Sequence, residues 1–353
     1  MHRIRRIRGF RPLGVLLLVT AFAACDDDNG PIGPVDPDNG VLTVDASTDW
    51  AFVRLGETAS EVSVSDPATS QAWDLAFFAT GVMLNSGAAG PGDVEGYCLC
   101  QNADATPDEI ARMTADTELA AFEAVTISSV PTDERAWQND ALVPAIEGWW
   151  SYDFTTHTVT PVTDNSWVVR TAEGEKHAKL RVAGMQNASQ SNAGQVTFEF
   201  AIQEAAGEPY GATQSVTVDV TNGPAYLDLL TASISDENDW DLRVEGYEIR
   251  LNSGVSGTGE AGAVNAGTPF DVTPIFDPVE MPPRIFVSDQ FGGVFDDNPW
   301  YHYDFATHQI WANFNVYLIR KGDEIYKVQL LSYNHPTDGR DRHISFRYAR
   351  LAD

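Results

Sequence analysis

The stretch WDLAFFATGVMLNSGAAGPG at residues 73–92 returns as WDLRVEGYEIRLNSGVSGTG at residues 240–259. The two stretches align without a gap, and one tryptophan, one aspartate, two leucines, one asparagine, one serine and three glycines coincide. Self-similarity over such a length indicates an internal repeat, which predicts that the neighbouring blocks recur as well.

Three further pairs of blocks recur, and their order is the same in each half of the chain. The matching pairs are LTVDAS at 42–47 with VTVDVT at 216–221, YDFTTH at 152–157 with YDFATH at 303–308, and VTFEF at 196–200 with ISFRY at 344–348. We therefore interpret the chain as two tandem copies of one domain, at residues 41–205 and 206–353.

The pattern within each copy is typical of β-strands. The segments SWVVRT at 166–171 and VYLIRK at 316–321 are rich in β-branched and aromatic residues. Each is followed by a glycine with polar neighbours, as in a hairpin turn. The segments VTFEF and ISFRY alternate between two faces with a period of two. These patterns predict an all-β fold of two tandem antiparallel β domains, with one helical insertion in the first.

One segment is predicted to be helical. Residues 106–124 read TPDEIARMTADTELAAFEA, with Thr106 as the N-cap, Pro107 at the first helical position and acidic residues in the first turn. The segment belongs to an insertion at residues 97–147 that is longer than its counterpart in the second copy.

Several classes of function find no support in the sequence. The glycine-rich stretches lack the Lys-Ser/Thr of a phosphate loop and the following helix of a dinucleotide site, so we assign them to tight turns. There is no nucleophile elbow and no His-Glu-x-x-His, and we predict that the protein is not an enzyme. The net charge of −29 argues against nucleic acid as a partner.

The first residues are typical of an exported protein. Five arginines within residues 1–11 precede an apolar run at 12–24, which is the layout of a secretory signal peptide. Cys25 follows directly and resembles the lipidated cysteine of a bacterial lipobox, although an ordinary signal peptide with a chance cysteine fits the same pattern. We predict a signal peptide at 1–24 and an acidic, lipidated tether at 25–40 that anchors the protein to a membrane.

Two more cysteines, Cys98 and Cys100, lie in the first copy. In an oxidising compartment they form either a strained local disulfide or free thiols. Two cysteines do not supply the four ligands of a structural zinc site.

The ordered blocks resemble the HmuY-like family of haem-binding bacterial lipoproteins. They comprise a Trp-Asp strand, an Asn-x-Gly-x-x-Gly-x-Gly turn, a variable loop, an aromatic segment, and a hairpin with Arg before its turn and Lys after it. This resemblance, which covers both copies, implies haem as the cofactor and cargo. It also implies an outer-membrane location, on the periplasmic or surface face, and transfer of haem to a receptor, with the TonB-dependent class as the candidate.

The resemblance also implies where iron ligands lie, namely in the aromatic segment and in the loop before it. His157 and His308 fall in the aromatic segments, and His302 lies six residues before His308. The preceding loops contain no histidine, so Met113 and Met281 are their only soft donors. We therefore predict His157 or His308 as the ligand of haem iron, with Met113, Met281 or His302 as the second.

Each of these residues also has a structural explanation. The repeated YDFxTH is expected to end a strand in a turn, where Asp and Thr bond their own backbone and the histidine caps the next strand. The basic residues of the hairpins, which are Arg170, Lys179, Arg320 and Lys327, either face haem propionates or pair with acids across strands. The alternative function is accordingly a non-catalytic scaffold, or a protein- or glycan-binding module, that has lost haem binding.

Overall fold

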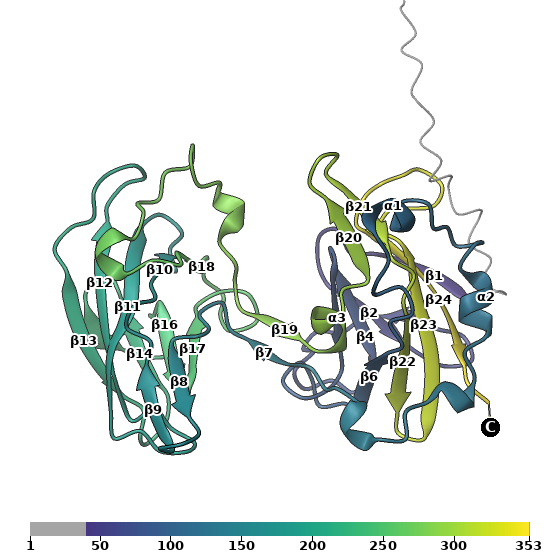
Figure 1. Cartoon of the computed structure of the whole chain (residues 1–353), viewed down its shortest axis with the longest axis horizontal. Coiled ribbons are helices and arrows are strands. Elements are labelled where there is room, and N and C mark those ends of the chain that lie inside the picture. The colour runs from purple at the N-terminus through teal and green to yellow at the C-terminus, as the bar shows by residue number, and fades with distance from the viewer. Residues whose placement is uncertain (1–39, 353) are drawn as a thin grey trace, which may run out of the picture.

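The computed structural model of the chain describes residues 40–352. They form two β lobes joined by a narrow two-stranded ribbon (Figure 1). Within this range no helix has the length and apolar character that spanning a membrane requires. The predicted signal peptide, Cys25 and all but the last residue of the tether lie outside the described residues.

Lobe I consists of residues 40–143 and 290–352. Its five-stranded antiparallel sheet has the order β1 (Val41–Asp45), β24 (His343–Arg350), β23 (Glu324–Ser332), β22 (Val316–Lys321) and β6 (Val94–Cys98). Its four-stranded sheet has the order β3 (Ser60–Val62), β2 (Ala51–Arg54), β4 (Leu75–Phe78) and β5 (Gly81–Leu84). A separate hairpin is formed by β20 (Tyr301–Asp304) and β21 (Gln309–Ala312).

Lobe II consists of residues 145–288 and repeats this plan. Its five-stranded sheet has the order β13 (Gln214–Asp219), β12 (Gln195–Gln203), β11 (His177–Gln186), β10 (Trp167–Arg170) and β18 (Gly262–Asn265). Its four-stranded sheet has the order β15 (Ser233–Ser235), β14 (Ala225–Asp228), β16 (Leu242–Glu245) and β17 (Glu248–Leu251). The hairpin is β8 (Trp150–Asp153) with β9 (Thr158–Pro161).

Each lobe combines strands from both halves of the chain. Residues 41–205 supply β1–β6 to lobe I and β8–β12 to lobe II, whereas residues 206–353 supply β13–β18 to lobe II and β20–β24 to lobe I. The chain crosses between the lobes through β7 (Ala141–Val143) and β19 (Gln290–Gly292), which pair with each other antiparallel. The predicted boundary near residue 205 therefore does not coincide with the boundary between the lobes.

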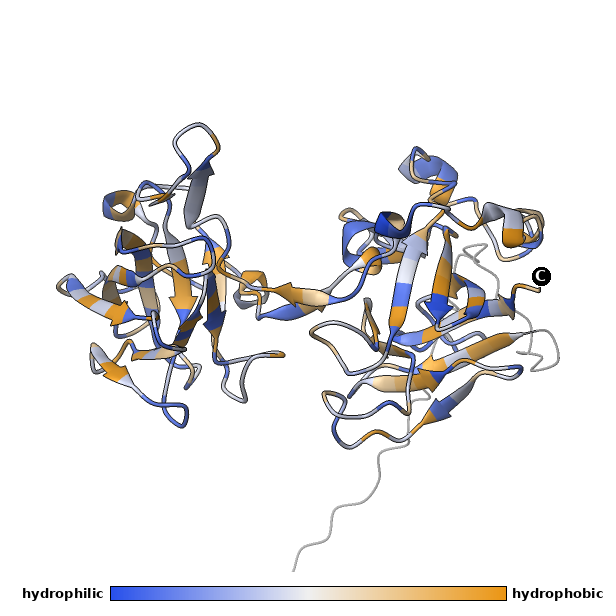
Figure 2. Cartoon of the chain, turned by 90° about the horizontal axis from the view of Figure 1, so that it is seen from below, coloured by the Kyte–Doolittle hydropathy of each residue, from blue (hydrophilic) through white to orange (hydrophobic). Residues whose placement is uncertain are grey.

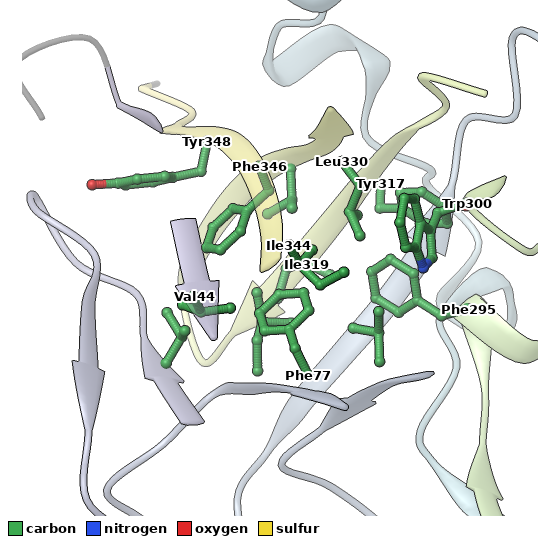
Figure 3. Close-up of a cluster of buried hydrophobic side chains, with 14 of the residues drawn as sticks. Val44, Phe77, Phe295, Trp300, Tyr317, Ile319, Leu330, Ile344, Phe346 and Tyr348 are labelled. Carbon is green, nitrogen blue, oxygen red and sulfur yellow. The ribbon is translucent and has the colours of Figure 1, made fainter. Parts of the chain in front are cut away.

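The hydrophobic core of lobe I lies between its two sheets and mixes the two halves of the chain (Figure 3). Phe77 of β4 stacks on Phe346 of β24 with ring centroids 5.2 Å apart. Burial of one such side chain stabilises the fold by about 1.5–3 kcal/mol. Figure 2 shows apolar residues gathered in the strands of both lobes and hydrophilic residues in the connecting loops. The largest apolar cluster of each lobe therefore contains side chains from both halves of the chain.

The all-β prediction is confirmed, since strands dominate and the helices are short. The predicted helix at 106–124 is wrong in its extent. Only α1 (Pro107–Ile110) and α2 (Leu119–Glu123) are helical, because Thr114 and Thr117 bond each other's backbone amides through their hydroxyls at 2.9 and 3.1 Å. The other helical turns are α3 (Val294–Asp297), η2 (Ile127–Ser129), η3 (Glu134–Ala136), η4 (Phe270–Val272) and η5 (Pro283–Ile285).

Candidate functional site

The repeated hexapeptide forms the turn of a β-hairpin in each lobe. The Asp153 carboxylate accepts hydrogen bonds from the backbone amides of Thr155 and Thr156 at 2.7 and 3.3 Å, and the turn ends at His157 with a φ of 55°. In lobe I the Asp304 carboxylate accepts from the Ala306 amide at 2.9 Å, and His308 has a φ of 60°. Histidine is one of the residues that tolerate this left-handed region. The turn alone therefore accounts for the recurrence of the motif.

The two turn histidines share one set of contacts. Nδ1 of His157 lies 2.7 Å from the Tyr152 hydroxyl, and Nδ1 of His308 lies 2.6 Å from the Tyr303 hydroxyl. Both rings are exposed on the hairpin surface. A histidine held in this way keeps Nε2 for another partner.

A groove lies beside the β20–β21 hairpin of lobe I. One part is a cavity of about 330 Å³ between three segments, which are the turn after α1, strand β21 with the residues that follow it, and the loop between β23 and β24. A second hollow of about 350 Å³ shares Ile310, Trp311, Tyr333 and Asn334 with the first, so the two adjoin. We call the two hollows together the lobe I groove.

The lobe I groove combines apolar walls with soft donor atoms. Its walls include Trp311, Phe314 and Leu331. Met113 and His335 line the first hollow, and His308 lines the second. The structure therefore places Met113, from the insertion of the first half, and His308, from the second half, in adjoining hollows.

His302 lies next to the groove rather than in its wall. It is the cross-strand partner of Trp311, and the two rings stack with centroids 6.0 Å apart. Because Trp311 borders both hollows, His302 supports the indole that forms part of the groove.

The other predicted ligands lie in lobe II. The Met281 side chain packs against a small apolar cluster that contains Val168, Phe276 and Phe286. The loop between β11 and β12, at residues 187–194, occupies the place that the His335 loop has in lobe I and contains no histidine. It lies against β16 and β17, where the Ala193 amide donates to Gly246 O at 3.1 Å. His157 and Met281 do not line the lobe I groove, and the loop at residues 187–194 brings no histidine into lobe II.

The basic residues of the hairpins are engaged within the protein. Arg320 forms ion pairs with Glu95 and Glu134, and Arg170 donates to Glu260 O at 2.7 Å. Lys327 is buried and donates to Phe122 O at 2.8 Å, as Lys179 donates to Phe270 O at 3.1 Å in lobe II. Burial lowers the pKa of Lys327. Arg320 and Lys327 thus contact the insertion at Glu134 and Phe122, and all four basic side chains have partners within the protein.

Arg347 is a site-supporting residue that the sequence pattern does not reveal. Its guanidinium donates to the Gln329 side chain at 2.6 Å and to Ala115 O at 2.8 Å, two residues beyond Met113. Burial lowers its pKa to about 10. The sequence does contain one signal for it, which is an arginine within the strand segment ISFRY. A charged side chain at a buried strand position needs a hydrogen-bond partner.

Two further points concern metal and thiol chemistry. Among residues 40–352 no group of three or more His, Cys, Asp or Glu side chains is placed to hold a metal ion. Haem iron does not require such a cluster, because the porphyrin fills four positions and the protein adds one or two axial ligands. Cys98 and Cys100 form a disulfide with Cα atoms 5.1 Å apart, which decides between the two alternatives for these thiols.

Residues 46–200 match the family model of the HmuY protein. The HmuY family is a haem-binding, non-enzymatic family, so the match supports a haem-related role. It spans β2–β6 of lobe I and β8–β12 of lobe II. The HmuY match does not extend to residues 206–353. That these residues form a second HmuY-like copy therefore stays a prediction. No curated protein matches the chain.

Proposed function

We propose that this protein is an exported, lipid-anchored haem-binding protein that holds one haem in the lobe I groove. The observation that carries the proposal is the presence of Met113, His308 and His335 around the aromatic and aliphatic walls of a single groove. Thioether and imidazole groups are the side chains that most often bind haem iron. Both hollows lie within the usual range for ligand pockets, about 300–1,000 Å³.

The residues present fit a haem. A bound haem would supply an iron that takes thioether and imidazole ligands, and Met113 Sδ and one imidazole of the groove would hold it. Trp311 and Phe314 would supply apolar contacts to the porphyrin, and His302 would keep the Trp311 ring in place. His157 and Met281 lie in lobe II, which makes them matched controls for His308 and Met113.

The proposed location rests on the first residues and on the family. Export by a signal peptide at 1–24 and acylation at Cys25 would anchor the chain to the bacterial outer membrane, on its periplasmic or surface face. A protein placed there would take up haem and pass it to a receptor, with the TonB-dependent class as the candidate partner. The tether at 25–40 would give it reach.

A haem titration of residues 26–353 tests the proposal. We expect a saturable Soret shift that ends at one haem per chain, and an affinity at least tenfold weaker in Met113→Leu, which keeps the side-chain volume. Met281→Leu should behave as the parent does. The proposal is wrong if micromolar haem gives no saturable shift, which is the behaviour of a scaffold that has lost the ligand. It is also wrong if Met281→Leu loses binding and Met113→Leu does not.

A further inference from the structure

His335 differs from every other histidine of lobe I in its position. It lies in the loop that joins β23 to β24, and it lines the same hollow as Met113. Its side chain is 25% exposed, so it is partly enclosed and still open on one side. His308 lines only the adjoining hollow, and His302 lines neither.

The loop holds the His335 ring in one orientation. Nδ1 lies 3.0 Å from the Asp338 carboxylate and 3.1 Å from the Thr337 hydroxyl, and the Thr337 amide donates to it at 3.4 Å. The backbone closes the loop, because the His335 amide donates to Arg340 O at 2.7 Å and the Gly339 amide donates to His335 O at 3.0 Å. Histidines that bind metals are held in this way, with Nδ1–H donated to a carboxylate and Nε2 directed to the metal.

The neighbouring His343 does not have a free ring nitrogen. Its ring lies edge-on to His335 with centroids 5.2 Å apart. Nδ1 lies 2.9 Å from Asp341 O, and Nε2 lies 3.5 Å from the Asp45 carboxylate. His343 is also buried, so it supports the loop and leaves ligand binding to His335.

The repeat gives a second argument for His335. The turn histidines occur in both lobes with the same tyrosine contact, so that contact by itself does not mark a ligand of the lobe I groove. His335 has no counterpart in residues 187–194. His335 lines the same hollow as Met113 and is not explained by the repeated turn, so it is the better candidate for a ligand.

We propose that His335 and Met113 are the axial pair for haem iron in lobe I, with Asp338 as the residue that positions the imidazole. This inference rests on the proposed function, because it names the ligands of that groove. Nε2 of a neutral imidazole and the thioether sulfur would each donate one electron pair to the iron. His308 would border the porphyrin without binding its metal.

The test compares haem with iron-free protoporphyrin IX on residues 26–353. Only the iron can use an axial ligand, so the parent protein should bind haem more tightly than protoporphyrin. In His335→Ala we expect at least a tenfold loss of haem affinity and an unchanged affinity for protoporphyrin. His157→Ala, the matched control in lobe II with the same tyrosine contact, should leave both affinities unchanged.

Spectroscopy provides the second readout. The haem complex of the parent should be six-coordinate and low-spin, and His335→Ala should lose that signature and regain it when free imidazole is added. Asp338→Asn should keep the fold, weaken the affinity for haem and leave the affinity for protoporphyrin unchanged. His335→Gln, which retains a polar side chain, replaces His335→Ala if the latter does not fold.

The outcomes separate the two proposals. A parent protein that binds neither porphyrin overturns the proposed function and this inference together. A parent that binds haem saturably while His335→Ala and His335→Gln keep the low-spin spectrum overturns the inference alone. Loss of that spectrum in His308→Ala would assign the ligand to the hairpin turn.

Discussion

Asn85 and Asn252 explain why the glycine turns carry three glycines each. The Asn85 side chain donates to Trp73 O at 2.8 Å and accepts from the Gly92 amide at 2.9 Å, and Asn252 repeats both contacts with Trp240 and Gly259. The sequence predicted tight turning, but not that an amide side chain fills the space that the glycines leave.

We predict that Gly90→Ala destabilises lobe I. A Cβ atom at Gly90 would lie 2.1 Å from Asn85 Oδ1 and 3.0 Å from the Trp73 ring, and neither group can withdraw without losing its packing. The expected loss is about 1–3 kcal/mol in the free energy of unfolding, measured by urea denaturation. Gly56→Ala is the control, because its nearest neighbour would be 3.6 Å away. Equal effects of the two substitutions would contradict this explanation.

The titration of Asp140 should lower the free energy of unfolding as the pH rises. Burial and the nearby Asp296 raise its pKa from 3.8 to about 7, while its carboxylate accepts from the Leu84 amide at 2.8 Å. Between these two values the folded protein holds a proton that the unfolded chain has released, so the free energy of unfolding falls as the pH rises. The difference corresponds to about 4 kcal/mol at most.

The substitution Asp140→Asn removes this titration. We expect a flatter dependence of the urea midpoint on pH between about 4 and 7. Asp241 and Asp289, whose pKa values are raised by burial, leave a remaining slope, and His177, whose pKa burial lowers to about 4, contributes with the opposite sign. Carboxylates with lowered pKa values, such as Asp153 and Asp304, act at lower pH and do not interfere. An unchanged slope in the variant would contradict the assignment.

At the scale of elements, strands were predictable and the insertion was not. Alternation and β-branched residues mark β10, β12, β22 and β24 because each strand must present one face to a core. The helical pattern of residues 106–124 was correct at its capped start and failed after Ile110. Before the helix resumes at Leu119, the hydroxyls of Thr114 and Thr117 compete for the backbone amides. Local helix propensity also does not reveal that Lys327 and Arg347, from strands β23 and β24, donate hydrogen bonds to backbone carbonyls of this segment.

The anchoring lysines give a matched pair of variants. Lys327→Met removes donors to Phe122 O and Val125 O at 2.8 and 3.0 Å but keeps the buried stem, and Lys179→Met removes the donor to Phe270 O in lobe II. Each variant should lose about 1–3 kcal/mol of stability. Only Lys327→Met should also weaken haem binding, because Met113 belongs to the insertion that Lys327 holds. The same loss of haem affinity in Lys179→Met would contradict a site in lobe I.

At the scale of the molecule, the exchange of halves was not predictable. Strand β6 has a suitable partner in β10 of its own copy and in β22 of the other, and the two partners have the same pattern of apolar residues. Sequence periodicity therefore predicts that β6 is paired but not with which strand. The exchange decides the site, since it places Met113 with His335 rather than with His157.

Cross-linking tests this exchange most directly. Glu95 of β6 is the register partner of Arg320 of β22, and their side chains form an ion pair. In residues 26–353 the variant Glu95→Cys/Arg320→Cys should form an intramolecular disulfide, identified by mass spectrometry of the peptides. Glu95→Cys/Arg170→Cys, which replaces the equivalent arginine of β10, should not. A 95–170 disulfide in place of the 95–320 disulfide would return Met113 to the copy that carries His157 and would contradict a groove built from both halves of the chain.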